Sequence, residues 1–202
     1  MTRIIDFYFD FISPFSYLAH VKLPEIARRA DCQLQYWPID LPEAKIAAGN
    51  YGPSNREIPA KIKVMAADLQ RWAALYGVPL AFPASFACET WNCAAVFARQ
   101  QGLAEPFVSA AYHRIWGCGV DPRNGDELRE SARDAGLDPD ALIDFVESPI
   151  GQNEYRKVRA QAYQRGVFGA PTMYVDDQVF WGNDRLDFLE SYLHSTESHA
   201  KP

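Results

Sequence analysis

The stretch IIDFYFDFISPFS, residues 4–16, decides the fold of this 202-residue chain. Residues 4–9 are a nearly unbroken apolar run, which is typical of a central parallel strand that is covered on both faces. Ser13 is a good helix N-cap, and Pro14 suits the first helical position, where its missing N–H costs nothing. The stretch therefore predicts a buried strand, a short turn and a helix that runs to about Ala30.

A strand that leads into such a turn and helix is the frame in which thioredoxin-like redox proteins carry a Cys-x-x-Cys pair at the helix N-terminus. In this chain Ser13 and Ser16 occupy the two cysteine positions. A dithiol is therefore excluded at this place. Any sulfur chemistry there must use a thiol that a ligand brings.

Strand patterns return near both ends of the chain, with helical patterns between them. Residues 33–39 alternate like a second strand, while residues 172–175 and 178–181 predict a hairpin. Residues 40–58 predict loop or short helical turns. Helical patterns occur at residues 59–76, 90–101, 104–116, 126–135, 139–147, 150–165 and 185–193.

We therefore predict an α/β fold, namely a thioredoxin-like domain with a large all-helical insertion. Residues 1–41 form the N-terminal β-α-β half of the domain, and residues 150–202 form the C-terminal α-β-β-α half. Residues 42–149 form the helical insertion. The closing residues SHAKP, 198–202, are expected to be frayed.

The composition of the chain argues against several classes of function. The net charge of −6 argues against nucleic acid as a partner, since phosphate binding needs a basic surface. No stretch approaches the ~20 apolar residues of a membrane span, and Asp6 and Asp10 interrupt any signal-peptide pattern. The cysteines lack redox or zinc spacing, so we expect no metal site and reduced, mostly buried thiols in a cytoplasmic protein; they are Cys32, Cys88, Cys93 and Cys118.

The N-terminus of the first predicted helix is the first candidate site. Its free N–H groups and the helix dipole favour an anion, and the Ser13 hydroxyl would point at that anion. A free thiol titrates near pH ~8.5, so stabilising its thiolate by about 1–2 kcal/mol leaves much of it ionised at neutral pH. A serine hydroxyl can donate a hydrogen bond to sulfur and cannot form a disulfide. The alternative is an ordinary N-cap serine.

The second candidate is the stretch VFGAPT, residues 167–172, which directly precedes a predicted strand. In thioredoxin-like folds a cis proline lies there, opposite the first turn of the helix, and the residue before it offers its backbone to an extended peptide. Ala170, before Pro171, could then hold a tripeptide thiol such as glutathione with its sulfur facing Ser13. The alternative is a trans peptide bond, which most X-Pro bonds adopt.

Two polar segments and a group of aromatic residues complete the candidates. The sequence WGNDR, residues 181–185, either only caps the last helix or also binds a carboxylate or an ammonium group. Lys45, Asn55 and Arg56 suit a substrate carboxylate, with a solvated charged loop as the alternative. Four aromatic residues form either the wall of a pocket or ordinary core: Phe82, Phe86, Trp91 and Trp116.

Five stretches, in this order, resemble the family of 2-hydroxychromene-2-carboxylate isomerases: DFYFDFISPFSYLA, GNYGPSNRE, DLQRWAALYGVPLAFPA, GVFGAPTM and WGNDRLDFLE. The resemblance extends from Ile4 to Glu190. It implies a dimeric, glutathione-dependent cytoplasmic enzyme of aromatic-hydrocarbon degradation, such as the naphthalene pathway. Enzymes of this kind interconvert 2-hydroxychromene-2-carboxylate and trans-o-hydroxybenzylidenepyruvate, and are related to kappa-class glutathione transferases and to bacterial disulfide oxidoreductases with helical inserts.

The resemblance also implies a role for each candidate residue. Ser13 would activate the glutathione sulfur, and Ala170 would bind glutathione through its backbone beside cis Pro171. The rest of the tripeptide would be held by Trp181, Gly182, Asn183 and Asp184, and the substrate by Lys45, Asn55 and Arg56. Two residues depart from the family pattern. Ala170 stands where valine is expected, and Phe86 stands where a substrate-facing tyrosine is expected, so one hydroxyl contact is missing.

On this resemblance we expect an isomerase that acts on an aromatic carboxylate by reversible addition of a thiolate, with Ser13 as a donor to the sulfur and not as a covalent nucleophile. Two alternatives stay open: a kappa-like glutathione transferase that conjugates electrophiles, and a non-catalytic thioredoxin-like binding module. A transferase consumes glutathione, whereas an isomerase regenerates it. The binding module predicts no affinity for glutathione.

Overall fold

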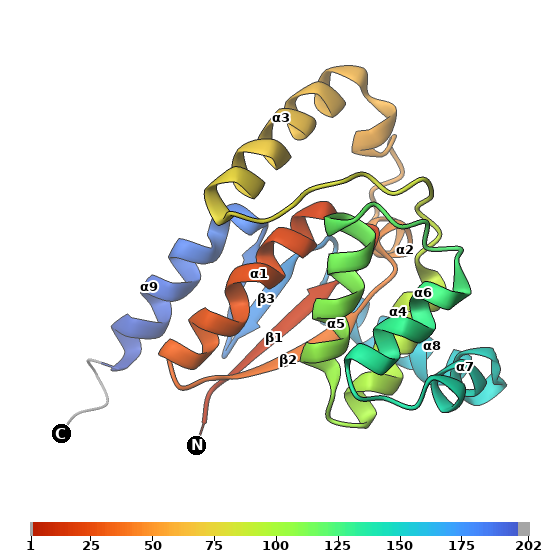
Figure 1. Ribbon diagram of the computed structural model, residues 1–202. Coiled ribbons are helices and arrows are strands. Elements are labelled where there is room, and N and C mark those ends of the chain that lie inside the picture. Colours follow the sequence, from red (N-terminus) through yellow and green to blue (C-terminus); the bar gives the residue numbers. More distant parts are fainter. Residues whose placement is uncertain (1, 198–202) are drawn as a thin grey trace.

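The first strand lies inside a mixed sheet. The computed structural model describes residues 2–197, and its sheet has the strand order β2-β1-β3-β4. β1 (Ile4–Phe9) pairs in parallel with β2 (Gln33–Pro38) and antiparallel with β3 (Thr172–Val175), and β3 pairs antiparallel with β4 (Gln178–Trp181). The apolar run at the start of the chain thus forms the central strand that the sequence predicts (Figure 1).

Helices cover both faces of this strand. Successive side chains of a strand point to opposite faces. Phe7 therefore stacks beside His20 of α1 (Pro14–Arg29), with the ring centroids 6.5 Å apart, whereas Tyr8 packs in a separate small cluster with Ala162 of α8 (Pro149–Gln164). Two covered faces explain why the strand is apolar along nearly its whole length.

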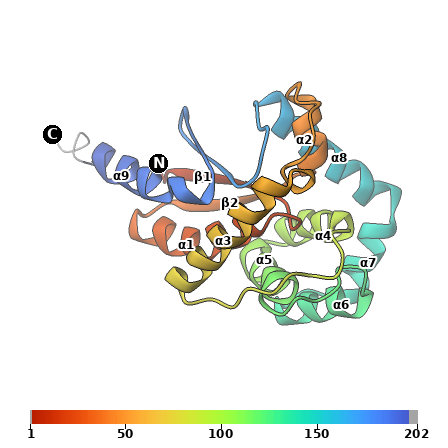
Figure 2. The same ribbon diagram turned by 90° about the horizontal axis from the view of Figure 1, so that it is seen from above.

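Most other helices lie between β2 and β3 in the chain. They are α2 (Leu41–Ala47), the 3-10 turn η1 (Asn55–Glu57), α3 (Pro59–Tyr76), α4 (Glu89–Gln100), α5 (Ala104–Tyr112), the π-helical turn η2 (His113–Gly117), α6 (Gly125–Asp134) and α7 (Pro139–Glu147). Helices α4 to α7 gather on one side of the molecule, whereas α3 crosses above α1 (Figure 1, Figure 2). The predicted α/β class with a large helical insertion is confirmed. Its division at residues 41 and 149 stays a prediction.

Several element ends differ from the sequence prediction. The helix predicted at 104–116 leaves the α-helical geometry after Tyr112, because its last turn is the π-helical η2. The final helix, predicted at 185–193, begins as the 3-10 turn η3 (Asn183–Arg185) and continues as α9 (Leu186–Glu197). The frayed end predicted for SHAKP lies outside the described residues.

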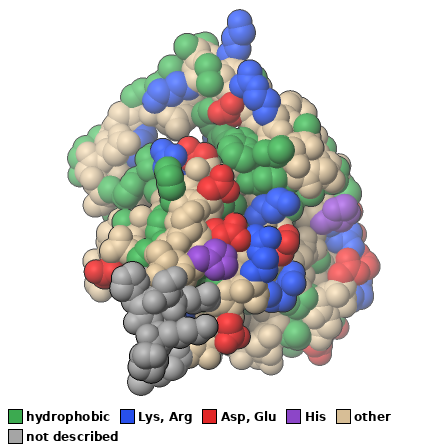
Figure 3. All heavy atoms as spheres, turned by 90° about the vertical axis from the view of Figure 1, so that its left-hand side faces the viewer, with side chains coloured by type: hydrophobic (Ala, Val, Ile, Leu, Met, Phe, Trp, Pro, Cys, Tyr) green, Lys and Arg blue, Asp and Glu red, His purple; other side chains and the backbone are tan. Residues whose placement is uncertain are grey.

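Helix α3 is anchored mainly through its C-terminal half. Its buried residues are Leu69 and Ala73, whereas the side chains of Ile62 and Val64 near its start are about half exposed or more. Beneath this helix the molecular surface is hollowed (Figure 3). Helix α3 therefore borders this hollow (Figure 3).

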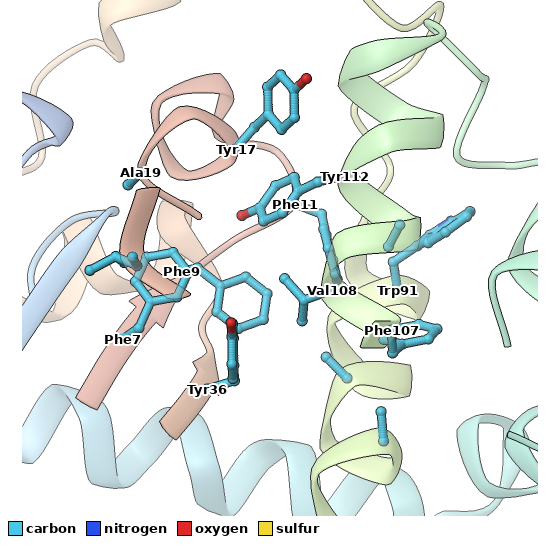
Figure 4. Close-up of a cluster of buried hydrophobic side chains, with 14 of the residues drawn as sticks. Phe7, Phe9, Phe11, Tyr17, Ala19, Tyr36, Trp91, Phe107, Val108 and Tyr112 are labelled. Atoms are coloured by element: carbon cyan, nitrogen blue, oxygen red, sulfur yellow. The ribbon is translucent and has the colours of Figure 1, made fainter. Parts of the chain in front are cut away.

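Aromatic rings join the sheet to the helices of the insertion. The ring centroids of Phe9 and Phe11 lie 5.2 Å apart, and Phe11 lies 4.8 Å from Tyr112 of α5 (Figure 4). Pairs in such edge-to-face arrangements contribute about 0.5–1.5 kcal/mol each beyond the burial of their area. The turn that follows β1 is thus packed against α4 and α5 by rings that are themselves fully buried.

No disulfide joins any two of the four cysteines, all of which lie in the described part of the chain. Cys88 and Cys93 are buried, Cys32 is half-buried and Cys118 is exposed, so the expectation of mostly buried thiols holds for all but Cys118. Within residues 2–197, no helix has the length and apolar character that crossing a membrane requires.

Candidate functional site

Ser13 lies at the start of α1, as the sequence predicts. It is the N-cap of this helix, and its Oγ accepts a hydrogen bond from the Ser16 N–H at 3.2 Å. The hydroxyl of Ser13 also donates to the backbone carbonyl of Ala170 at 3.4 Å, across 157 positions of sequence. The first turn of α1 holds no acidic side chain that would compete for the helix N-terminus. The two principal candidates of the sequence analysis are therefore neighbours.

A buried carboxylate holds the turn that carries Ser13. Asp10 is 3% exposed, and its carboxylate accepts hydrogen bonds from the Ile12 N–H at 3.0 Å, the Leu41 N–H at 2.8 Å and the Asn92 side chain at 2.7 Å. Burial raises the pKa of Asp10 to about 6, although these hydrogen bonds act in the opposite direction. The sequence analysis missed this residue. The only available signal was an acidic residue inside an apolar stretch.

Asn92 of α4 completes this arrangement, and both the nitrogen and the oxygen of its side-chain amide form hydrogen bonds. Its Nδ2 donates to Asp10 and, at 3.1 Å, to the Ile39 carbonyl, while its Oδ1 accepts from the Phe11 N–H at 3.1 Å. Three segments therefore meet at one buried polar cluster: the turn after β1, the end of β2 and the start of α4. A fully satisfied cluster of this kind specifies a single geometry for the turn.

We expect Asp10→Asn to change the pH dependence of stability. Between about pH 4 and pH 6 the folded protein holds a proton on Asp10 that the unfolded chain has already lost, so wild-type stability falls as the pH rises through this window. The Asn variant cannot titrate there. The free energy of unfolding of wild type minus that of the variant should therefore decrease by about 2 kcal/mol from pH 4 to pH 7.

Urea unfolding of both proteins at several pH values measures this difference. Burial lowers the pKa of His20 to about 3, which gives a pH dependence of the opposite sign, but this contribution is common to both proteins and cancels. Two stability curves that run parallel between pH 4 and pH 7 would contradict the assignment.

The second candidate, residues 167–172, lies against the strand pair β3 and β4. The Ala170–Pro171 peptide bond is cis, and the Pro171 carbonyl accepts the Gly182 N–H at 2.9 Å. A Cβ atom on Gly169 would lie 2.7 Å from the indole nitrogen of Trp181, so glycine allows the indole to lie against the backbone here. Among the described residues, none accepts a hydrogen bond from the Ala170 N–H.

The third candidate, residues 181–185, adjoins this backbone. Gly182 has a φ of 106°, and a Cβ there would lie 2.5 Å from Asp184 Oδ1, so only glycine fits. Asn183 is 3% exposed; its Oδ1 accepts from the Tyr76 hydroxyl at 3.4 Å, while its Nδ2 has no partner among the described residues. Asp184 is exposed and forms an ion pair with Arg185. Hydrogen bonds thus connect residues 13, 170–171 and 181–184 into one group, of which Trp181 and Asp184 are exposed.

The predicted substrate residues lie on the segment that begins with α2. The polar cluster around Asp10 connects the start of this segment to the turn that carries Ser13. Leu41, the first residue of α2, is bound by the Asp10 carboxylate. Further along, Lys45 Nζ donates to the Gly52 carbonyl, and Asn55 Oδ1 accepts from Lys61 at 3.0 Å. Asn55 also lines a cavity of about 410 Å³ at the start of α3. A larger cavity of about 550 Å³ lies beside β2 and contains none of the predicted site residues.

Arg56 and Phe86 form a stack at the edge of this segment. The Arg56 guanidinium lies 4.4 Å from the centroid of the Phe86 ring. Phe86 and Phe82 both pack on Trp116, with ring centroids 6.1 Å and 5.8 Å away. Phe82 and Phe86 are exposed, so they are available as an aromatic wall, whereas Trp116 and Trp91 are buried and belong to the core.

This arrangement suits a peptide that carries a thiol, with an anionic substrate beside it. One surface offers a helix N-terminus, a serine hydroxyl, a free backbone N–H and a buried amide. The other offers two cations and two exposed aromatic rings. No group of His, Cys, Asp and Glu side chains in residues 2–197 has the arrangement of a metal site.

Comparisons with known proteins point the same way. The model of the DSBA-like thioredoxin domain family matches residues 4–194. The 2-hydroxychromene-2-carboxylate isomerase of Sphingobium xenophagum is 75% identical over 193 residues, which are 96% of this chain and 99% of that protein. A solved structure of 2-hydroxychromene-2-carboxylate isomerase has a TM-score of 0.91 at 38% identity and covers 98% of this chain and 100% of its own. The glutathione transferase kappa 2 of Caenorhabditis elegans is 26% identical over 220 residues, covering 99% of this chain and 97% of its own.

Proposed function

Because the chain belongs to the 2-hydroxychromene-2-carboxylate isomerases, within the DSBA-like thioredoxin domain family, we propose that it is a glutathione-dependent isomerase of aromatic-hydrocarbon catabolism. Its reaction would interconvert 2-hydroxychromene-2-carboxylate and trans-o-hydroxybenzylidenepyruvate, as in a naphthalene-type pathway. The kappa-class relative supports the choice of glutathione. A cytoplasmic location and a homodimer belong to the same proposal.

The observation that carries the proposal is the position of the Ser13 hydroxyl. It lies at a helix N-terminus and 3.4 Å from the Ala170 carbonyl, beside a backbone that can receive an extended peptide. A thiol held along this backbone would have its sulfur near Ser13. The hydroxyl would then turn from the carbonyl to the sulfur and donate its proton in a hydrogen bond.

The residues of this surface fit glutathione on three points. The Ala170 N–H is free to bind a peptide carbonyl. Within residues 2–197 the buried Asn183 Nδ2 has no partner, and leaving such a donor unsatisfied costs about 1–3 kcal/mol unless a ligand carbonyl or carboxylate accepts its hydrogen bond. Exposed Asp184 offers a carboxylate to an ammonium group. A tripeptide with one amino group, two carboxylates and two peptide bonds matches these donors and acceptors.

Glutathione, when bound, would supply a thiolate that adds to the conjugated double bond of the unsaturated α-keto acid exposed when the ring of the substrate opens. Rotation about the resulting single bond and expulsion of the thiolate would give the trans product and regenerate glutathione. Ser13 would stabilise the negative charge on the sulfur, with the N-terminus of α1 behind it. Because Ser13 donates a hydrogen bond and does not form a bond to carbon, it is not the nucleophile in this scheme.

The segment that begins with α2 would orient the substrate. Lys45, Asn55 and Arg56 would bind its carboxylate and favour the enolate charge that develops during addition. Phe82 and Phe86 would pack against the aromatic ring and exclude water from that side. Phe86 has no hydroxyl, so at this position the ring of the substrate would be recognised by its shape alone.

Turnover of 2-hydroxychromene-2-carboxylate, followed by absorbance after gel filtration to remove bound ligand, tests the proposal. We expect equilibration with the product only after glutathione is added, and no loss of thiol in a parallel assay. The same assay with an electrophilic substrate gives the control for conjugation.

Two outcomes would overturn the proposal. Consumption of glutathione in proportion to product would indicate a transferase. No turnover of any substrate, together with no heat of glutathione binding in calorimetry, would indicate a non-catalytic module.

A further inference from the structure

Trp116 contacts both halves of the candidate site. It is 1% exposed and lies in the π-helical turn η2, a geometry that is rare and frequent at functional sites. Its indole N–H donates to the Phe11 carbonyl at 2.7 Å, two residues before Ser13. This is the only hydrogen bond that the Phe11 carbonyl accepts from the described residues. The side chain is therefore a direct support of the turn that carries Ser13.

The same residue also supports the aromatic wall. The ring of Trp116 lies behind Phe82 and Phe86, and the Trp116 carbonyl accepts the Ala81 N–H at 2.7 Å. Phe86 in turn carries the Arg56 guanidinium on its face. An unbroken series of contacts thus runs from Arg56 through Phe86 and Trp116 to the turn before Ser13.

We propose that Trp116 is a positioning residue, which sets the placement of the Ser13 hydroxyl relative to the Arg56 guanidinium. This inference rests on the proposed function, because it assumes that Ser13 meets a thiol and that Arg56 meets the substrate. The indole N–H acts on the thiol side, through Phe11, and the indole ring acts on the substrate side, through Phe86. The two effects are separable, because different parts of one side chain produce them.

The variant Trp116→Phe separates them. It keeps an aromatic ring behind Phe86 but removes the donor to Phe11. The matched control is Trp91→Phe: Trp91 is also fully buried in the insertion, and its indole N–H donates to the Pro122 carbonyl at 2.8 Å and not to the turn that carries Ser13. The Trp91 ring packs on the Phe11 ring, with the centroids 6.3 Å apart, and phenylalanine keeps an aromatic ring there. Both variants lose one buried indole hydrogen bond, so both should lower the melting temperature by similar amounts.

Activity should distinguish the two variants. For Trp116→Phe we expect kcat at neutral pH to fall about 10-fold, with the KM for the carboxylate substrate within about 2-fold of wild type. The ultraviolet absorbance of the thiolate should show a smaller ionised fraction of bound glutathione. Trp91→Phe should match wild type in all three quantities, and Phe86→Leu should raise the KM with the thiolate fraction unchanged.

Equal losses of kcat and thiolate signal in the Trp116 and Trp91 variants would overturn the inference. If Trp116→Phe does not fold, fluorine NMR of wild-type protein grown with fluorotryptophan replaces it. The Trp116 resonance should then shift on addition of glutathione and again on addition of substrate, while the Trp91 resonance stays in place; an unmoved Trp116 resonance would overturn the inference. A wild-type enzyme that needs no glutathione would instead overturn the proposed function, so the two failures are distinguishable.

Discussion

Alanine in place of Ser13 is expected to lower turnover by about 100-fold or more. The hydroxyl would supply roughly 3 kcal/mol of stabilisation to the thiolate and to the transition state, and loss of a single donor of this kind commonly costs about 10²–10³ in kcat. Alanine has no hydrogen-bond donor in its side chain. The helix dipole and the free N–H groups remain in the variant, but they do not replace the hydroxyl that donates to the sulfur. Steady-state turnover at saturating glutathione measures the effect.

The Ser13 variant also loses a helix cap, so the control must lose one too. Ser148 is the N-cap of α8, and its Oγ accepts the Gly151 N–H at 2.9 Å, as Ser13 Oγ accepts the Ser16 N–H. Ser148→Ala should lose a similar stability, about 1 kcal/mol, and keep full turnover. Wild-type turnover in Ser13→Ala would disprove the role assigned to the hydroxyl.

Alanine in place of Gly151 is expected to destabilise the fold by about 3 kcal/mol, at the upper end of the usual cost of overpacking. Helices α7 and α8 are separated only by Ser148, and they approach so closely that a Cβ on Gly151 would overlap the Phe145 carbonyl oxygen and lie 2.8 Å from its carbon. The neighbour is backbone, so it cannot move aside as the end of a flexible side chain can. Urea unfolding measures the change in the free energy of unfolding.

Gly125 supplies the control for this variant. It begins α6, and no atom lies within 4 Å of a Cβ built on it. Gly125→Ala should leave stability unchanged or raise it by up to about 1 kcal/mol, because alanine is the better helix former. Equal stabilities of the two variants would show that α7 and α8 can separate without loss.

The sequence predicts well those features that depend on neighbouring residues. The strand at residues 4–9 and the helix at 59–76 follow from patterns of apolar residues and from caps that lie within a few positions. The proximity of Ser13 and Ala170 was also predicted, but only from the geometry of thioredoxin-like folds, in which the cis-proline segment lies opposite the first turn of the helix. Nothing in the spacing of the two residues indicates it.

Other features depend on partners that local patterns cannot reveal. The role of Asp10 depends on donors at residues 41 and 92, so the sequence shows only an unexplained acidic residue. The helix that carries Trp116 looks continuous from residue 104, because the change to π-helical geometry is made by hydrogen bonds and leaves the apolar pattern intact. The exposed wall consists of phenylalanines and the buried rings behind it are tryptophans. Both types are aromatic, so the sequence does not say which line a pocket, and only burial assigns Phe86 to the wall and Trp91 to the core.

The turn that carries Ser13 also determines when, during synthesis and folding, the chain would acquire the proposed binding surface. The hydrogen bonds that hold this turn join positions that are far apart along the chain, with sequence separations of 31, 82, 105 and 157. Closing loops of these lengths is unfavourable in entropy, and all of them must be closed before the surface is complete. A nascent chain that has emerged only to the middle of the insertion therefore lacks both Trp116 and Ala170. Affinity for the ligand would therefore arise only when the whole fold is complete. Because the ligand binds only the complete fold, binding would stabilise the entire folded state relative to the unfolded chain.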